Sequence, residues 1–179
     1  MMPVSVVVPD EFKPLWETGD ASPIVKYPAE VLRVPAKPVE RVNKELRQLA
    51  EEMIRAMRQA NGIGLAGPQV GRSVRVIITA AEGRPRAMFN PEILEASGEV
   101  VGQEGCLSLP GLYGDVPRAQ RVKVRFLDDQ NRVRVEEHEG LSARVIQHEV
   151  DHLHGILFID KVIVETLHWE WPSGAGERV

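Results

Sequence analysis

The segment His148-Glu149-Val150-Asp151-His152 constrains this chain more than any other part of its sequence. Two histidines four residues apart lie on one face of an α-helix, with their Cβ atoms roughly 5–6 Å apart. At that spacing both imidazoles can bind one metal ion, and Glu149 between them can act on a water molecule at that ion. The sequence therefore predicts a helix near residue 150 that faces a metal site.

A third ligand decides which class of metal site this helix carries. Around the motif the helix carries four apolar residues, Val145, Ile146, Val150 and Leu153. They predict a largely buried helix, in which ionisable groups need partners. The only cysteine of the chain, Cys106, stands in Glu104-Gly105-Cys106-Leu107-Ser108. Two histidines and one cysteine would leave one coordination position open, as in catalytic sites. We interpret the set as a mononuclear hydrolase site with Glu149 as general base.

Two other interpretations of the motif remain open at this point. A downstream glutamate, Glu165 or Glu170, would complete the site of a thermolysin-like metallopeptidase. Alternatively, the metal would only stabilise a catalytically silent binding protein. The peptidase would require Glu165 or Glu170 and not Cys106. The binding protein would keep its function without Glu149, whereas the hydrolase requires both Cys106 and Glu149.

Composition narrows the class of protein further. A chain of 179 residues fits one domain with a substantial core. With a net charge of −4, the chain is not expected to have the basic surface that binding to DNA or an anionic membrane requires. No apolar run in the sequence is long enough to span a membrane. A single cysteine excludes an intrachain disulfide framework and suits a reducing compartment. The first thirty residues lack the pattern of a targeting peptide. We therefore expect a cytoplasmic protein with no DNA or membrane partner.

The periodicity of apolar residues predicts an α+β fold in a single domain. One long helix should begin at the N-cap Asn43 and stop at Gly62, and a second should run from Ser142 to His154 and stop at Gly155. Short strands are predicted near 74–78, 86–90, 98–104, 121–127 and 132–138. With no regular βαβ alternation, the order of elements favours α+β. We expect an irregular N-terminal arm over 1–20, a catalytic domain over 21–165 and a short C-terminal tail over 166–179.

Three segments together resemble the three motifs of the peptide deformylases, in order and in spacing. They are Gly62-Ile63-Gly64-Leu65-Ala66-Gly67-Pro68-Gln69, Glu104-Gly105-Cys106-Leu107-Ser108 and His148-Glu149-Val150-Asp151-His152. The resemblance extends from about Pro23 to Lys161. It implies a metal-bearing central helix packed among several small β-sheets. It also implies removal of the N-formyl group from the formyl-methionine that begins newly made polypeptides, with release of formate.

The resemblance also implies a role for each matching residue. The metal ligands would be Cys106, His148 and His152, with Glu149 as general base and acid. The oxyanion would be held by Gln69 and the backbone N–H of Leu107. Ile63 and Gly105 would hydrogen-bond the peptide backbone, and the methionine pocket would be bordered by Gly64, Leu141 and Val145. Outside the ligand set, Asp151 would pair with Arg118, and Glu104 would orient a metal histidine.

The implied cofactor is one divalent metal ion. The family typically uses Fe²⁺, and a thiolate with two imidazoles also suits Ni²⁺, Co²⁺ or Zn²⁺.

Two residues depart from the family pattern. Gly67 replaces a common alanine and is expected to loosen the loop that holds Gln69, and Arg144 stands at a pocket-side position that is apolar in some members. Because the long C-terminal helix of some members is absent, no ribosome contact is inferred.

Overall fold

The computed structural model describes residues 4–17 and 22–172, so parts of the expected arm and tail lie outside the described residues. The α-helices are α1 (Lys13–Trp16), α2 (Lys44–Gln59) and α3 (Gly140–Leu153). The strands are β1 (Gly64–Ala66), β2 (Val76–Thr79), β3 (Arg86–Ser97), β4 (Val100–Cys106), β5 (Leu109–Arg118), β6 (Arg121–Leu127), β7 (Val133–Glu139) and β8 (His168–Trp169). Short 3₁₀ helices connect them at Asp10–Phe12, Glu30–Arg33, Gly67–Val70, Phe158–Asp160 and Val164–Thr166.

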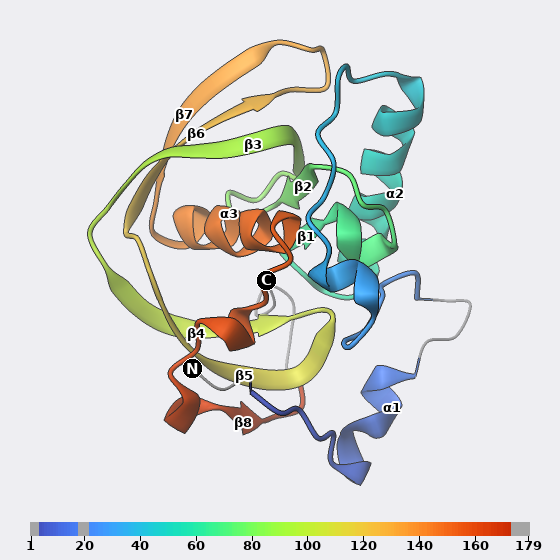
Figure 1. Cartoon of the computed structure of the whole chain (residues 1–179), viewed down its shortest axis with the longest axis vertical. Helices are drawn as coiled ribbons and strands as arrows, with labels where there is room; N and C mark the ends of the chain where they lie inside the picture. The colour runs from blue at the N-terminus through green and yellow to red at the C-terminus, as the bar shows by residue number, and fades with distance from the viewer. Residues whose placement is uncertain (1–3, 18–21, 173–179) are drawn as a thin grey trace.

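The fold is α+β, as predicted, with α3 in the middle of the molecule (Figure 1). The described strands form two antiparallel sheets, one of five strands in the order β1-β2-β3-β6-β7 and one of three in the order β4-β5-β8. In Figure 1 the larger sheet curves around one side of α3, β4 and β5 cross the other side, and α2 lies at the periphery. The helix therefore reaches residues from both sheets.

Helix α2 forms where the sequence predicts it. The Asn43 side chain accepts a hydrogen bond from the Leu46 N–H at 2.9 Å, which satisfies one of the unpaired donors of the first turn. Its apolar face, including the fully buried Met53, packs against β1 and β2. The residue predicted to stop the helix, Gly62, was wrong by one position, because Asn61 is the left-handed residue that follows the helix. The helix ends at Gln59, and Asn61 takes the left-handed conformation with φ 58°.

Helix α3 is buried over most of its length because its apolar residues fill the space between the sheets. Ala143, Ile146, Val150 and Leu153 pack against the inner face of the five-stranded sheet. Fully burying a Val, Ile or Leu side chain stabilises the fold by roughly 1.5–3 kcal/mol. The last helical residue is Leu153, and Gly155, the predicted stop, follows the C-cap with φ 73°; the helix begins at Gly140, two residues before the predicted start at Ser142. The packing fixes which face of α3 is turned towards β4.

Strand β5 is the main element that the sequence analysis did not predict. Its prolines and glycines, including Pro110 and Pro117, favour turns over strand. The strand forms because β4 pairs with Leu109 and with residues 113–118, while β8 pairs only with Leu112 and Tyr113. Pro117 thus lies where β5 pairs with β4 on one side only, and Pro110 lies in the register shift between the Leu109 and Tyr113 pairs, so that the missing N–H is tolerated at both positions.

The N-terminal segment is more regular than expected. Residues Asp10–Phe12 and Lys13–Trp16 form consecutive helical turns. The ring of Phe12 contacts those of Trp169 and Trp171, and the Trp16 indole donates to the Pro110 carbonyl at 2.8 Å. This segment therefore packs on the three-stranded sheet.

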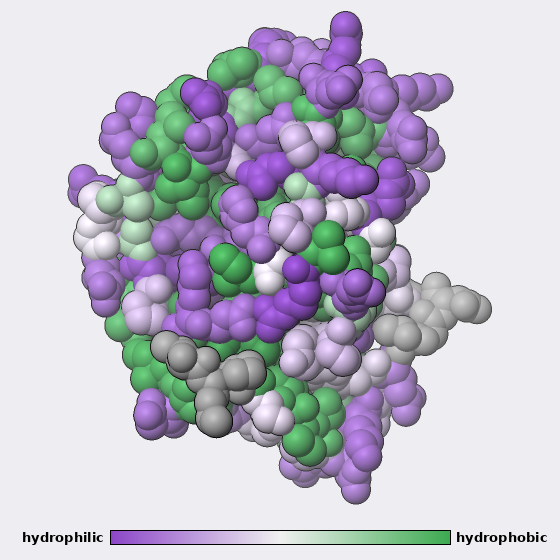
Figure 2. Space-filling view, viewed as in Figure 1, coloured by the Kyte–Doolittle hydropathy of each residue, from purple (hydrophilic) through white to green (hydrophobic). Residues whose placement is uncertain are grey.

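The exterior is mixed in character. In Figure 2 hydrophilic residues are spread over the visible face, with smaller hydrophobic areas between them. Among the described residues, no helix has the length and apolar character needed to cross a membrane.

Two glycines at the ends of α3 give a matched stability test. Both have positive φ, 63° at Gly140 and 73° at Gly155. A Cβ at Gly140 would meet nothing within 4 Å, whereas at Gly155 it would lie 2.5 Å from the Arg33 carbonyl oxygen. We expect Gly140→Ala to cost about 1–2 kcal/mol of left-handed strain, and Gly155→Ala to cost more because backbone must also move. Equal losses in urea unfolding would contradict this account.

Candidate metal centre

The structure brings the three predicted ligands together. Cys106 ends β4, and His148 and His152 lie one turn apart on the face of α3 that is turned towards it. One donor atom from each residue lies within 4.8 Å of the other two, and all three side chains are buried. The Cys106 Sγ lies 3.4 Å from the His152 Nε2. A sulfur and two imidazole nitrogens at this separation fit one divalent transition metal with a coordination position left open.

Unpaired polar atoms support the same conclusion. Among the described residues, the His148 Nε2 and both carboxylate oxygens of Glu149 are buried without a hydrogen-bond partner. Nearly all buried polar atoms in proteins have partners, so a group of unpaired atoms in one place indicates a site for something else. The residues present therefore fit a metal and its ligand water.

Glu149 and Cys106 have perturbed pKa values for the same physical reason. Complete burial, with a smaller effect from the negative charge of Glu104, raises the pKa of Glu149 well above its ordinary value. Burial, together with the charge of Glu149, raises the pKa of the Cys106 thiol to about 12. Both groups thus strongly favour a neighbouring positive charge, which a bound metal would provide.

The predicted carboxylate next to the metal histidine is present. Glu104 Oε1 accepts a hydrogen bond from His148 Nδ1 at 2.8 Å, which directs Nε2 of the ring towards Cys106 and His152. Arg118 donates to both oxygens of Glu104, each at 2.9 Å. Burial alone would raise the pKa of Glu104, but hydrogen bonds from His148 and Arg118 hold it well below its ordinary value of 4.5. The predicted pairing of Arg118 with Asp151 is also confirmed.

Arg144 has a different environment from the one its position suggested. Its guanidinium is buried and donates to Glu104 Oε2 at 2.6 Å and to the Val116 carbonyl at 2.9 Å. The sequence offers no signal for these contacts, because Glu104 and Arg144 are 40 residues apart.

Gln69 lies beside the cysteine. Its side-chain Nε2 is 3.5 Å from Cys106 Sγ and donates to the Ser108 hydroxyl at 3.1 Å, while its Oε1 accepts from the Ala66 N–H at 2.9 Å. Ser108 was missed by the sequence analysis, although it stands within the cysteine motif. At Gly67 a Cβ would lie 2.6 Å from the Val74 carbonyl oxygen, so the backbone packs closely against this glycine.

The predicted substrate residues are only partly grouped. A Cβ on Gly64 would lie 2.6 Å from Glu149 Oε1 and 2.9 Å from Val145 Cγ1, so these three residues meet at the site. Leu141 lies one turn before Val145 and is 52% exposed. The Ile63 carbonyl already accepts from the Ala80 N–H at 2.8 Å.

Gly105 and Leu107 flank the cysteine in sequence. At Gly105 a Cβ would lie 2.6 Å from the Tyr113 ring, so the close packing of that ring also requires glycine. Leu107 lies in the turn between β4 and β5, with its side chain against Gly62. Both backbone segments are buried next to the metal group.

The alternative ligands lie outside this group. Glu165 and Glu170 are exposed, and neither belongs to the donor set of Cys106, His148 and His152. Glu170 instead lies 3.2 Å from His168 Nε2. The geometry thus does not support a thermolysin-like ligand set.

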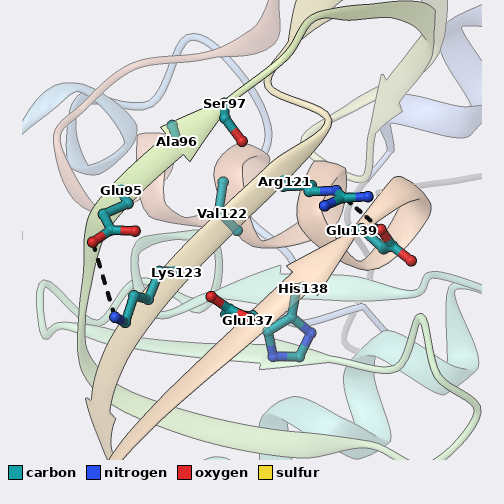
Figure 3. Close-up of a pocket in the computed structure, with 9 residues that line it drawn as sticks. All are labelled: Glu95, Ala96, Ser97, Arg121, Val122, Lys123, Glu137, His138 and Glu139. Atoms are coloured by element: carbon teal, nitrogen blue, oxygen red, sulfur yellow. Dashed lines mark ion pairs between the residues drawn. The ribbon is translucent and has the colours of Figure 1, made fainter.

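A concavity of about 690 Å³ on β3, β6 and β7 is not a competing site (Figure 3). Four of its charged side chains form pairs across the strands, Glu95 with Lys123 at 3.9 Å and Arg121 with Glu139 at 3.2 Å. These pairs are exposed, and the surface carries no unpaired buried group among the described residues.

The Glu104 cluster leads to a stability prediction. Because the folded-state pKa of Glu104 is lowered, its charge stabilises the fold above the ordinary pKa of 4.5, and this contribution is lost as the pH falls towards the folded-state value. We expect Glu104→Gln to cost about 3–5 kcal/mol at pH 7 and to flatten the acid side of the stability profile. The exposed Glu92–Arg125 pair provides the control, since Glu92→Gln should cost about 0–1 kcal/mol in the same denaturant titration.

Known proteins resemble this chain over most of its length. The sequence matches the Polypeptide deformylase family over residues 21–167. Peptide deformylase 1 of Bacillus anthracis is 50% identical over 141 residues, which cover 78% of this chain and 90% of the relative.

Solved structures agree. Peptide deformylase from Thermotoga maritima superposes with a TM-score of 0.76 at 42% identity, covering 78% of this chain and 95% of that one. A Met-Ala-Ser-bound class I type b peptide deformylase from Acinetobacter baumannii has a TM-score of 0.76 at 42% identity, covering 79% and 98%. Since family, relatives and fold coincide over most of its length, this chain belongs to the peptide deformylase family.

Proposed function

We propose that this protein is a metal-dependent hydrolase that removes the N-formyl group from the N-terminal formyl-methionine of newly made polypeptides. One observation carries the proposal: the buried, unpaired carboxylate of Glu149 follows His148 on the helix that carries two donors of a Cys-His-His group, in a chain of the deformylase family. A carboxylate in that environment is suited to accept and return a proton.

The reaction is hydrolysis of a formamide. The oxygen of water bonds to the formyl carbon, the bond between that carbon and the methionine nitrogen breaks, and formate leaves. Glu149 takes the proton from the water and delivers it to the departing amine. Burial raises the pKa of Glu149 above its ordinary value, which is the direction that brings a carboxylate closer to a neutral working pH.

Cys106, His148 and His152 would hold one metal ion, which when bound supplies a Lewis acid next to the carbonyl. We propose Fe²⁺ as the native ion, with Ni²⁺, Co²⁺ or Zn²⁺ as alternatives that suit the same ligands. Glu104 fixes the His148 ring so that Nε2 is the free nitrogen. The protein thus contributes a preformed donor set.

Gln69 and the Leu107 N–H are proposed to stabilise the oxygen of the formyl group as it gains charge. The Gln69 amide is fixed by Ala66 and Ser108 with its NH₂ group beside Cys106, which supports this role. A preorganised donor of this kind contributes about 10²–10³ to the rate.

The substrate is proposed to be a formyl-methionyl peptide. We place its methionine side chain against Gly64, Leu141 and Val145, and its backbone along Ile63 and Gly105. The related Acinetobacter baumannii enzyme has been solved with Met-Ala-Ser bound, a peptide that begins with methionine. Such a peptide is the expected product of deformylation.

We further propose a cytoplasmic location, which the single cysteine and its reducing compartment support. The division into an arm over 1–20, a catalytic domain over 21–165 and a tail over 166–179 is likewise a proposal.

Replacing the base tests the function directly. We expect Glu149→Gln to lower formate release from a short formyl-Met peptide by about 10²–10⁴-fold, because the proton acceptor is lost. Metal content should be retained, since Glu149 is not a ligand. Glu165→Gln is the matched control and should keep full activity. Activity that depends on Glu165 and not on Glu149 would favour the peptidase, and activity indifferent to Glu149 would rule out the proposed base.

The proposed metal has its own test. Protein loaded with Fe²⁺ without oxygen should lose activity during aeration, because iron beside a thiolate is prone to oxidation. Protein loaded with Ni²⁺ should keep its activity under the same treatment. An iron-loaded sample that remained fully active after prolonged aeration would contradict Fe²⁺ chemistry of this kind and favour a redox-inert ion.

A further inference from the structure

We infer that Arg144 is a positioning residue for the metal centre and acts on His148 through Glu104. This inference rests on the proposed function, because it concerns how the same metal site is held. Arg144 belongs neither to the ligand group nor to the residues proposed to contact the substrate. Its contacts nevertheless end at the carboxylate that fixes a proposed ligand.

Arg144 completes the hydrogen bonding of Glu104. Oε1 accepts from Arg118 Nη2 at 2.9 Å and His148 Nδ1 at 2.8 Å, while Oε2 accepts from Arg118 Nε at 2.9 Å and Arg144 Nη1 at 2.6 Å. A carboxylate offers about four acceptor positions, so each is used here. A carboxylate held from every side cannot rotate, and the direction of the His148 hydrogen bond is therefore fixed.

Arg144 also fixes the distance between the two elements that carry the ligands. From α3, which carries His148 and His152, it donates to the Val100 carbonyl of β4 at 2.7 Å and the Val116 carbonyl of β5 at 2.9 Å. Strand β4 ends at Cys106. One rigid, planar donor group thus joins the histidine-bearing helix to the strand of the cysteine, and lysine lacks this geometry.

Gly102 provides the space for this guanidinium. A Cβ there would lie 3.1 Å from both Cζ and Nη2 of Arg144, closer than ordinary contact. Gly102 and Glu104 are two residues apart on β4, so both lie on the strand face towards α3. A side chain at residue 102 would therefore displace the guanidinium without touching a proposed ligand, which offers a second way to disturb the same contact.

The test measures Co²⁺ affinity of the folded protein by competition with a chelator, well below the unfolding temperature. We expect Arg144→Met to weaken Co²⁺ binding by about 10–100-fold, as for other outer residues of metal sites. Arg144→Lys keeps a cation near Glu104 and should recover part of the loss. Gly102→Ala should weaken binding in the same direction by a smaller factor, and it keeps the test available if Arg144→Met does not fold.

Arg86→Met is the matched control. Arg86 forms a two-pronged pair with Glu136 on the five-stranded sheet, at 2.9 and 2.7 Å. Its removal should lower stability but leave Co²⁺ affinity unchanged. If folded Arg144→Met or Gly102→Ala binds Co²⁺ as tightly as the unchanged protein, the inference is overturned.

Kinetic measurements distinguish a residue that positions the metal centre from one that shapes the methionine pocket. Deformylation by the metal-saturated Arg144→Met protein should show a lower kcat with little change in KM, because His148 is misplaced. A change confined to KM would mean that Arg144 instead shapes the methionine pocket, which overturns the inference. If the unchanged protein binds Co²⁺ but releases no formate, the proposed function fails, and the affinity measurement still decides the role of Arg144.

Discussion

The buried carboxylate of Glu104 is the interaction on which the arrangement of this protein depends. Removing a charge from water costs several kcal/mol, so an isolated carboxylate at this depth would not stay ionised. Two guanidinium groups, from Arg118 on β5 and Arg144 on α3, compensate that cost. Because these residues come from different elements, satisfying one charge also fixes β4, β5 and α3 relative to one another.

Two glutamates at the site show how environment separates their roles. Glu104 is surrounded by donors and has a lowered pKa, whereas Glu149 is buried without a partner and has a raised one. The first suits a permanently charged support for His148, and the second suits a group that gains and loses a proton. Pairs of carboxylates whose environments push their pKa values apart commonly divide structural and acid–base work in this way.

The predicted elements that formed are those with strong local signals. Asn43 caps α2, and Gly155 follows the C-cap of α3, because each places a suitable residue at a position with a specific backbone requirement. Strand β5 had no such signal, since its prolines and glycines favour turns and its pairing partner is what makes it a strand. Asn61, and not the predicted Gly62, is the left-handed residue after α2. Asparagine and glycine both tolerate that conformation, so the local sequence allowed either residue and packing decided between them.

The sequence by itself determined the two histidine donors, because two histidines at helical spacing can bind one metal on one helix face, and it indicated the family through three ordered motifs. Only the tertiary structure decided that Arg144 turns onto Glu104, that Ser108 holds Gln69, and that the Glu149 carboxylate is left unpaired. The physical reason is the distance along the sequence over which each interaction acts. Helix spacing and caps act between residues a few positions apart, whereas a buried charge chooses its partners from whatever elements the fold brings within hydrogen-bond distance.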